Sequence, residues 1–146
     1  MDKIFTKEGD RTMSGTNRPA IRIKRVYEPP APEDGVRILV DRLWPRGVSK
    51  EQASIDEWMK EIAPSPELRT WFGHRPERFA EFASGYEREL AEDPVRLRLA
   101  DRICETALRQ PVTLVYAAKD PVHNHAIVLQ HWLNRRPNPD GRKRLF

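Results

Sequence analysis

The feature that most constrains the fold of this chain is a continuous apolar run, Val-Thr-Leu-Val-Tyr-Ala-Ala, at residues 112–118. A strand exposed on one side alternates apolar and polar residues, whereas an unbroken run is typical of a strand covered on both faces of a parallel sheet. Two other segments predict strands, because residues 21–26 alternate apolar and basic side chains and residues 36–40 form a short β-branched run. With 146 residues the chain has room for one domain.

Helices are predicted for much of the remaining chain. Three expected helices share one start, a Ser or Asp cap followed by proline at the first helical position, at Ser65-Pro66, Asp93-Pro94 and Asp120-Pro121. Apolar residues spaced three and four apart predict two more helices, one capped by Ser49 and ending near Ile62, and one over residues 76–90. The expected fold is a single compact α/β domain with a small, mainly parallel sheet covered by helices.

The charge of the chain is concentrated at its ends. The first 20 residues carry a net +1 and residues 135–146 a net +4, so residues 21–134 carry about −1 of the total of +4. We expect a flexible tail over residues 1–19, the α/β domain over residues 20–134 and a basic tail over residues 135–146. Since the basic charge lies in the tails, it is only weak support for nucleic-acid binding by the folded part.

Several classes of protein are excluded by what the sequence lacks. No segment approaches the roughly 20 apolar residues of a membrane span, so we expect a soluble cytoplasmic protein with no membrane partner. The single cysteine, Cys104, can form neither an internal disulfide nor a cysteine metal cage, and its apolar neighbours predict a structural role. No cofactor motif is present.

The loop after the second strand is the first candidate site. Arg42 and Arg46 bracket Trp44 in the segment DRLWPRG, residues 41–47. Guanidinium groups bind phosphate or carboxylate through two parallel bonds, and an indole offers a stacking face. The alternative is structural, with Arg42 paired to Asp41 or to another carboxylate and Trp44 filling the edge of the core.

The second candidate site lies between the last strand and the last helix, where ligands of open α/β sheets gather. Its polar residues are Lys119, Asp120, His123, Asn124 and His125. A helix beginning at residue 121 would offer its N-terminus to an anion, and His123 is the better acid–base candidate. His123 and His125 point in different directions on a helix, so no metal site is expected. In the alternative, the helix is simply capped and the histidine satisfies a buried carbonyl.

The third candidate is the segment LRTWFGH, residues 68–74. Trp71 and Phe72 are most simply core residues, and Gly73 is a natural helix end. His74 then faces either solvent or a cleft. Tyr86 could place its hydroxyl in the same cleft, although its place on an apolar helical stripe also explains it.

Three motifs of this chain resemble those of a known family. DRLWPRGVSK at residues 41–50, IAPSPELRTWFGH at 62–74 and LVYAAKDPVHNHA at 114–126 are similar to the YeaO-like branch of the domain of unknown function 488 family. The resemblance covers about residues 21–134 and implies a small α/β domain from the bacterial or archaeal cytosol. It also implies that the shared polar residues converge on one pocket, namely Arg42, Trp44, Arg46, His74, Lys119, Asp120, His123 and Asn124. His125 departs from the asparagine associated with its position.

These residues support several functional hypotheses. In the first, Arg42, Trp44, Arg46, Lys119, Asn124 and Tyr86 bind a small anionic ligand such as a phosphate, a carboxylate or a nucleotide-like molecule. In the second, the protein is an enzyme on such a ligand, with His123 or His74 as general acid–base and Asp120 orienting the imidazole. A nucleic-acid-associated protein, using the basic C-terminal tail and the Arg-Trp loop, and a purely structural partner protein are further alternatives. Neither a metal nor a cofactor is implied.

Overall fold

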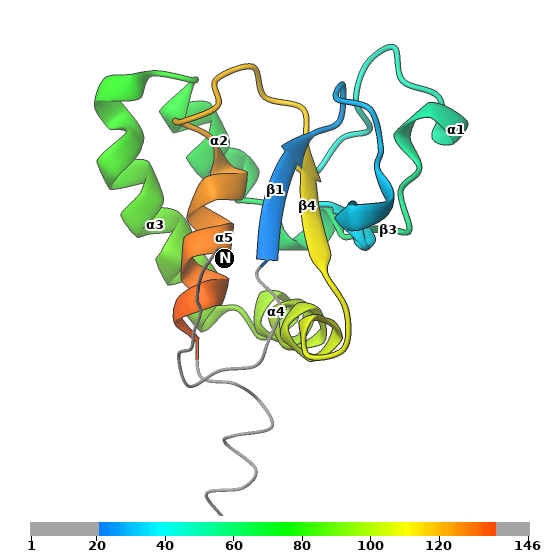
Figure 1. Ribbon diagram of the computed structural model, residues 1–146. Coiled ribbons are helices and arrows are strands. Elements are labelled where there is room, and N and C mark those ends of the chain that lie inside the picture. The colour runs from blue at the N-terminus through cyan, green and yellow to red at the C-terminus, as the bar shows by residue number, and fades with distance from the viewer. Residues whose placement is uncertain (1–20, 137–146) are drawn as a thin grey trace, which may run out of the picture.

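The computed structural model, which describes residues 21–136, contains a four-stranded sheet with helices around it (Figure 1). The strands are β1 (Ile21–Arg25), β2 (Val36–Leu39), β3 (Glu57–Trp58) and β4 (Val112–Tyr116). Their order is β1-β4-β2-β3, and every neighbouring pair is parallel. The predicted α/β class with a small parallel sheet is therefore confirmed.

The apolar run that predicts a doubly covered strand forms the centre of the sheet. All five residues of β4 are buried, and the strand pairs with β1 on one side and β2 on the other. Leu114 belongs to the main core cluster, whereas its neighbour Val115 packs in a second cluster with Leu39. Because successive strand side chains point to opposite faces, these two clusters are the two faces of the sheet.

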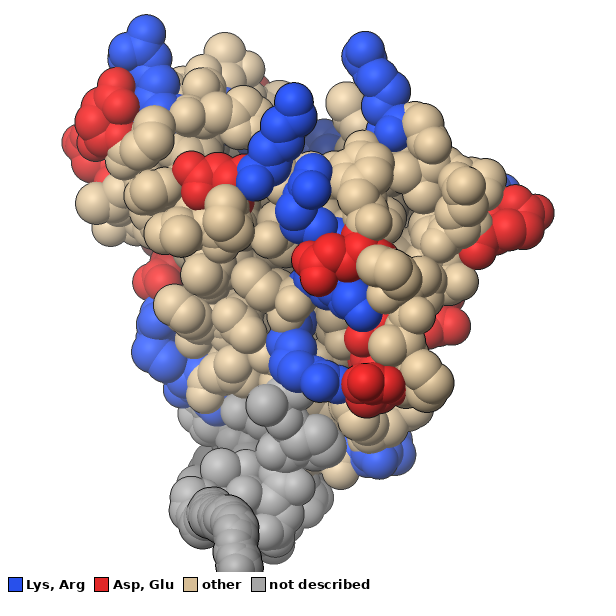
Figure 2. All heavy atoms as spheres, turned by 45° about the horizontal axis from the view of Figure 1, so that its top comes forward, with Lys and Arg blue, Asp and Glu red and all other residues tan. Residues whose placement is uncertain are grey.

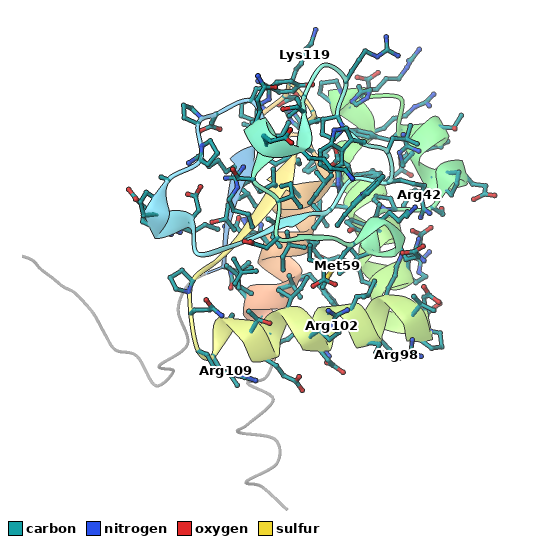
Figure 3. All side chains as sticks on the ribbon, turned by 90° about the vertical axis from the view of Figure 1, so that its right-hand side faces the viewer. Arg42, Met59, Arg98, Arg102, Arg109 and Lys119 are labelled. Atoms are coloured by element: carbon teal, nitrogen blue, oxygen red, sulfur yellow. The ribbon has the colours of Figure 1, made fainter. Side chains whose placement is uncertain are left out.

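The main face of the sheet is covered by three helices. They are α3 (Phe79–Glu92), α4 (Pro94–Ala107) and α5 (His125–Arg135). Helices α4 and α5 pack on the strands, and α3 packs on both of these helices. Figure 3 shows α4 at the opposite end of the molecule from Lys119, with Arg98 and Arg102 along it. Cys104 is buried on the inner side of α4, as its apolar neighbours predict.

The prediction of one helix from Ser49 to about Ile62 is wrong. The structure has a single turn, α1 (Lys50–Ala53), followed by β3 and a short 3-10 turn over Lys60–Ile62. Ser49 does cap α1, but Ser54 adopts the left-handed conformation at φ 50° and ends it. The chain then runs beside β2, because Asp56 bonds to both backbone groups of Arg37. The backbone N–H of Asp56 donates to the carbonyl of Arg37, and the carboxylate of Asp56 accepts the N–H of Arg37. The apolar residues spaced three and four apart therefore lie in separate elements and not on one helix.

Two of the three Ser/Asp-Pro helix starts are confirmed. Ser65 caps α2 (Pro66–Phe72), and Asp93 caps α4. The third prediction is wrong, because α5 begins at His125 and is capped by Asn124. Asp120 instead accepts the backbone N–H groups of residues 122 and 123 within a turn, which holds the intervening segment out of the helix.

The end of α2 contains one confirmed and one wrong prediction. Gly73 ends the helix in the left-handed conformation, at φ 54°. Phe72 is a core residue that stacks on Phe82 with ring centroids 4.3 Å apart. Trp71 is not a core residue, because 39% of it is exposed and the guanidinium of Arg78 lies over its ring.

The described chain includes the first two residues of the expected C-terminal tail. Helix α5 includes Arg135, and the guanidinium of Arg136 lies 2.8 Å from a carboxylate oxygen of Asp101. The expected tails over residues 1–19 and over the rest of 135–146 lie outside the described residues. None of the helices within residues 21–136 is long and apolar enough to cross a membrane.

The carboxyl ends of the strands point to the top of Figure 1. Figure 2 brings this end forward and shows several Lys and Arg side chains rising from it with uncharged surface between them. The loops that follow β2 and β4 meet at this end, because the two strands are adjacent and parallel.

Candidate functional site

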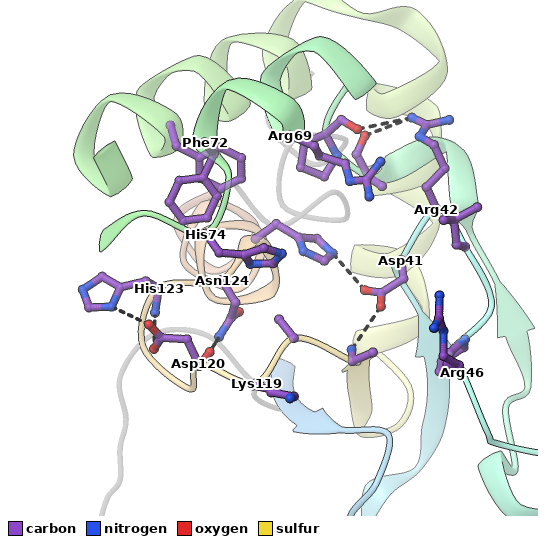
Figure 4. Close-up of a pocket in the computed structure, with 18 of the residues that line it drawn as sticks. Asp41, Arg42, Arg46, Arg69, Phe72, His74, Lys119, Asp120, His123 and Asn124 are labelled. Atoms are coloured by element: carbon purple, nitrogen blue, oxygen red, sulfur yellow. Dashed lines mark hydrogen bonds and ion pairs between the residues drawn. The ribbon is translucent and has the colours of Figure 1, made fainter. Parts of the chain in front are cut away.

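A pocket of about 850 Å³ lies at the carboxyl ends of β2 and β4 (Figure 4). Open parallel sheets place ligand sites at this edge. Its walls come from the loop after β2, from the segment around Ala63 with α2, and from the turn between β4 and α5. The three sequence motifs thus meet in one place, and the residues that line the pocket include Arg42, Trp44, Arg46, His74, Lys119, Asp120, His123 and Asn124.

Asp41 joins the two strand ends beneath the pocket. Its Oδ2 accepts the backbone N–H of Ala117 at 3.0 Å, and its backbone carbonyl accepts the indole N–H of Trp58 at 2.7 Å. Trp44 donates its indole N–H to the carbonyl of Val48 and packs edge-on against Trp58. Trp44 therefore braces the loop as well as lining the pocket.

Four cations line the pocket, namely Arg42, Arg46, Arg69 and Lys119. Within residues 21–136 no carboxylate lies at ion-pair distance from any of them. The arginines Arg37, Arg96 and Arg102, by contrast, each pair with a carboxylate.

Arg42 is held only loosely by its neighbours. One terminal nitrogen lies 3.4 Å from the carbonyl oxygens of Ala63 and Pro64, and its buried Nε has no hydrogen-bond partner in the described part of the chain. The expected alternative, an internal pair between Arg42 and Asp41, is not formed. Figure 4 shows the Arg42 side chain reaching the two carbonyl groups and not the neighbouring carboxylate.

His123 is oriented by a carboxylate. Its Nδ1 lies 2.9 Å from Oδ2 of Asp120, and its ring packs edge-on against Phe79. The backbone N–H groups of His123 and Val122 and the imidazole together lower the pKa of Asp120 to about 2. The ionised carboxylate favours a proton on Nδ1, which leaves Nε2 of a neutral His123 as a hydrogen-bond acceptor.

His125 and Asn124 hold the base of the pocket together. His125 Nε2 lies 3.1 Å from the carbonyl oxygen of Val40 and 3.2 Å from Oδ1 of Asp41. Asn124 is buried, accepts the N–H of Ile127 and donates to the carbonyl of Asp120. Asn124 therefore acts as a brace, and its side chain is already engaged on both sides.

Two polar residues of the pocket, Arg69 and Thr70, are absent from the candidates that the sequence suggests, whereas His125 is among those candidates but has no role assigned to it. His125 precedes the buried Val128 and Leu129 by three and four positions, so the helical pattern itself places it on the face that meets the sheet. Arg69 and Thr70 lie on the exposed side of α2, where no apolar pattern distinguishes them from ordinary surface residues.

The remaining candidates, His74 and Tyr86, occupy different environments. His74 is exposed in the left-handed conformation at φ 58°, and its ring points into the pocket (Figure 4). Tyr86 does not line the pocket. It is fully buried and donates its hydroxyl to the carbonyl of Ile62 at 2.7 Å, and burial raises its pKa far above the usual value. Among residues 21–136, no three His, Cys, Asp or Glu side chains are placed to hold a metal ion.

The fold and the site define a small α/β domain with a parallel sheet and a cation-lined pocket at its carboxyl edge. Within this class, the chain belongs to the inactive DUF488-N3 subclade, whose family model matches residues 20–143. The resemblance inferred from the three motifs is therefore confirmed.

The relatives that the chain matches are covered over nearly their whole length. It is 48% identical to the uncharacterised protein YeaO of Escherichia coli over 113 residues, which cover 77% of this chain and 96% of that protein. It is 44% identical to the uncharacterised protein Rv3073c of Mycobacterium tuberculosis over 116 residues, or 80% of this chain and 95% of the relative. The uncharacterised protein Mb3100c of Mycobacterium bovis matches with the same identity and coverage. No solved structure matches the chain significantly.

Proposed function

We propose that the pocket binds a small anionic molecule and that the protein is a binding module rather than a catalyst. The observation that carries this proposal is the set of four cations, Arg42, Arg46, Arg69 and Lys119, which share one pocket without a carboxylate partner in the described part of the chain. Like charges gathered in a partly enclosed space repel one another, and a bound anion relieves that repulsion.

The two carboxylates of the pocket are unavailable to the cations. Asp41 is engaged by Ala117 and His125, and Asp120 by its own turn and His123. The positive charge of the pocket is therefore left for a ligand. Phosphate and carboxylate groups match the paired donors of a guanidinium, and the volume of about 850 Å³ suits a molecule of drug size.

The enzyme hypothesis is the second candidate, and it rests on one contact. Asp120 lies 2.9 Å from Nδ1 of His123, an arrangement that can orient an imidazole for proton transfer. The description of the family subclade as inactive favours binding without turnover. Nucleic-acid binding through the basic C-terminal tail is less favoured, because the folded part carries almost no net charge. We expect the protein to act in the cytoplasm.

A thermal-shift screen tests the proposal. The probes are nucleotides, phosphorylated metabolites and small carboxylates, and a ligand of the native state raises the melting temperature by mass action. We expect the stabilisation seen in the wild type to be lost in the double variant Arg46→Ala/Arg69→Ala. Arg98→Ala is the matched control, because this arginine is exposed on α4, far from the pocket (Figure 3).

Two results would overturn the proposal: no anion of any class raises the melting temperature, or the double variant responds as strongly as Arg98→Ala. Turnover is examined on the compounds that bind. Consumption by the wild type and not by His123→Ala would replace the binding module with the enzyme hypothesis.

A further inference from the structure

We infer that the ligand is an aromatic anion, a planar ring that carries one phosphate or carboxylate group. This inference rests on the proposed anion-binding function and specifies the ligand class. Its basis is that a cluster of aromatic rings lines one side of the pocket, whereas Arg42 and Arg46, with Trp44 between them in the sequence, line the other. Figure 4 shows Arg42 and Arg46 on one side of the pocket, and Phe72 and His123 on the other.

The cationic side lies at the mouth of the pocket. Arg46, Arg69 and Lys119 are all exposed, and none of their side chains is held by a carboxylate of residues 21–136. An anionic group bound there would keep part of its hydration while contacting these donors. Full burial of the anion is unnecessary, which keeps the cost of desolvation low.

The other side of the pocket is built from aromatic rings. Phe72 stacks on Phe82 in the wall, and the ring of His74 lies beside Phe72 with centroids 6.1 Å apart. His123 packs edge-on against Phe79, with centroids 5.2 Å apart. His74 and His123 thus extend the aromatic wall into the accessible part of the pocket, and both of them line it.

The accessible imidazole rings of His74 and His123 suit an aromatic ligand better than an alkyl chain. The ring of His74 makes no hydrogen bond within the described residues, and Nε2 of His123 is the nitrogen turned away from Asp120. An aromatic ligand can stack on the face of an imidazole, and a polar group on the ligand can form a hydrogen bond with a free imidazole nitrogen. Since the pocket holds about 850 Å³, a bare phosphate would leave most of it to water, whereas an aryl phosphate fills both sides.

Matched pairs of probes test the inference. Phenyl phosphate is compared with methyl phosphate, and benzoate with acetate, by NMR titration of the histidine ring protons in the full-length protein. We expect each aromatic probe to bind the wild type about tenfold more tightly than its aliphatic partner, which is the scale of one good ring contact.

Two variants test which side of the pocket binds the aromatic ring and which side binds the anionic group. His74→Asn removes the ring but keeps a residue that tolerates the left-handed conformation, so the fold is preserved. We expect it to abolish most of the aromatic preference and to weaken phenyl phosphate binding far more than methyl phosphate binding. Arg46→Ala/Arg69→Ala should weaken phenyl phosphate and methyl phosphate by the same factor. His131→Ala, an exposed residue of α5, is the control.

The outcomes separate this inference from the proposed function. Equal binding of phenyl and methyl phosphate overturns the aromatic ligand and leaves the anion pocket standing. A preference that persists in His74→Asn overturns the placement of the ligand ring against His74, because the ring would then lie elsewhere. If no phosphate or carboxylate binds at all, the proposed function fails and the inference fails with it.

Discussion

His125 Nε2 lies 3.2 Å from Oδ1 of Asp41, which joins the first residue of α5 to the end of β2. The other oxygen of the same carboxylate accepts the N–H of Ala117 at the end of β4. One Asp-His pair therefore fixes three segments under the pocket, and with them the loops that carry Arg42 and Lys119. The contact is structural as well as being part of the pocket lining.

Replacing His125 by alanine should destabilise the protein. The carbonyl of Val40 would lose its donor, and Oδ1 of Asp41, which accepts no hydrogen bond within the described residues, would lose the ring nitrogen that lies 3.2 Å away. Leaving a buried acceptor unpaired costs about 1–3 kcal/mol. Urea unfolding measures the change. His131→Ala, on the exposed side of the same helix, should change stability by less than about 0.5 kcal/mol. Similar losses in the two variants would show that the contacts of His125 with Val40 and Asp41 contribute nothing.

The sequence predicts the parts of this fold in which local pattern and tertiary structure agree. The run at 112–118 predicts a central parallel strand because only such a strand is covered on both faces. The caps Ser65 and Asp93 predict helix starts because their side chains bond the backbone three residues on. The pocket follows from these elements, since loops after adjacent parallel strands end at one edge.

The predictions fail where the same residues can form either of two local structures. Asp120 precedes a proline just as Ser65 and Asp93 do, but it bonds residues 122 and 123 in a turn, and Asn124 takes over as the cap. Between 49 and 62, the apolar spacing is met by separate packing contacts. Arg69 belongs to the pocket only because the tertiary fold brings α2 and the loop after β2 to the same cavity, and no local pattern encodes that arrangement.

Asp34 should be among the residues on which stability depends most. The side chain is buried between Arg37, at 2.7 Å, and Lys24, at 3.1 Å, and it accepts the N–H of Ala31. Burial raises its pKa, but these bonds outweigh burial and hold the pKa below the usual 3.8.

The variant Asp34→Asn leaves the Arg37 charge buried without its partner, which costs about 3–5 kcal/mol. Urea unfolding at neutral pH measures the loss. Glu77→Gln is the control, because Glu77 and Arg75 form an exposed pair at 3.5 Å, worth at most about 1 kcal/mol. An Asp34→Asn loss no larger than that of the control would contradict the importance of this pair.

Two glycines with positive φ should respond very differently to alanine. Gly35 has φ 66°, and a Cβ there would overlap the backbone oxygen of Pro111, which accepts the N–H of Val36 at the start of β2. Gly47 has φ 77° but nothing within 4 Å of the same position. Gly47→Ala should therefore cost only backbone strain, about 1–2 kcal/mol, whereas Gly35→Ala adds a clash for a total of about 3 kcal/mol or more. Thermal unfolding of the two variants gives the difference, and equal losses would place the clash in doubt.

The turn after β4 should keep its structure in unusually acidic solution. The N–H groups of His123 and Val122 and the His123 ring lower the pKa of Asp120 to about 2, against 3.8 for the ordinary group. Since the folded pKa is the lower one, the carboxylate stabilises the turn fully above about pH 3.8 and loses this effect as the pH falls through about 2.

NMR titration of the Asp120 side-chain carboxyl carbon should therefore give a midpoint of about 2 in the native protein, and of about 3.8 in concentrated urea. The amide protons of Val122 and His123 should shift with the same midpoint, because they bond the titrating oxygen at 2.9 and 3.0 Å. A native midpoint near 3.8 would mean that the turn leaves Asp120 free, and that His123 lacks the orienting carboxylate on which the enzyme hypothesis depends.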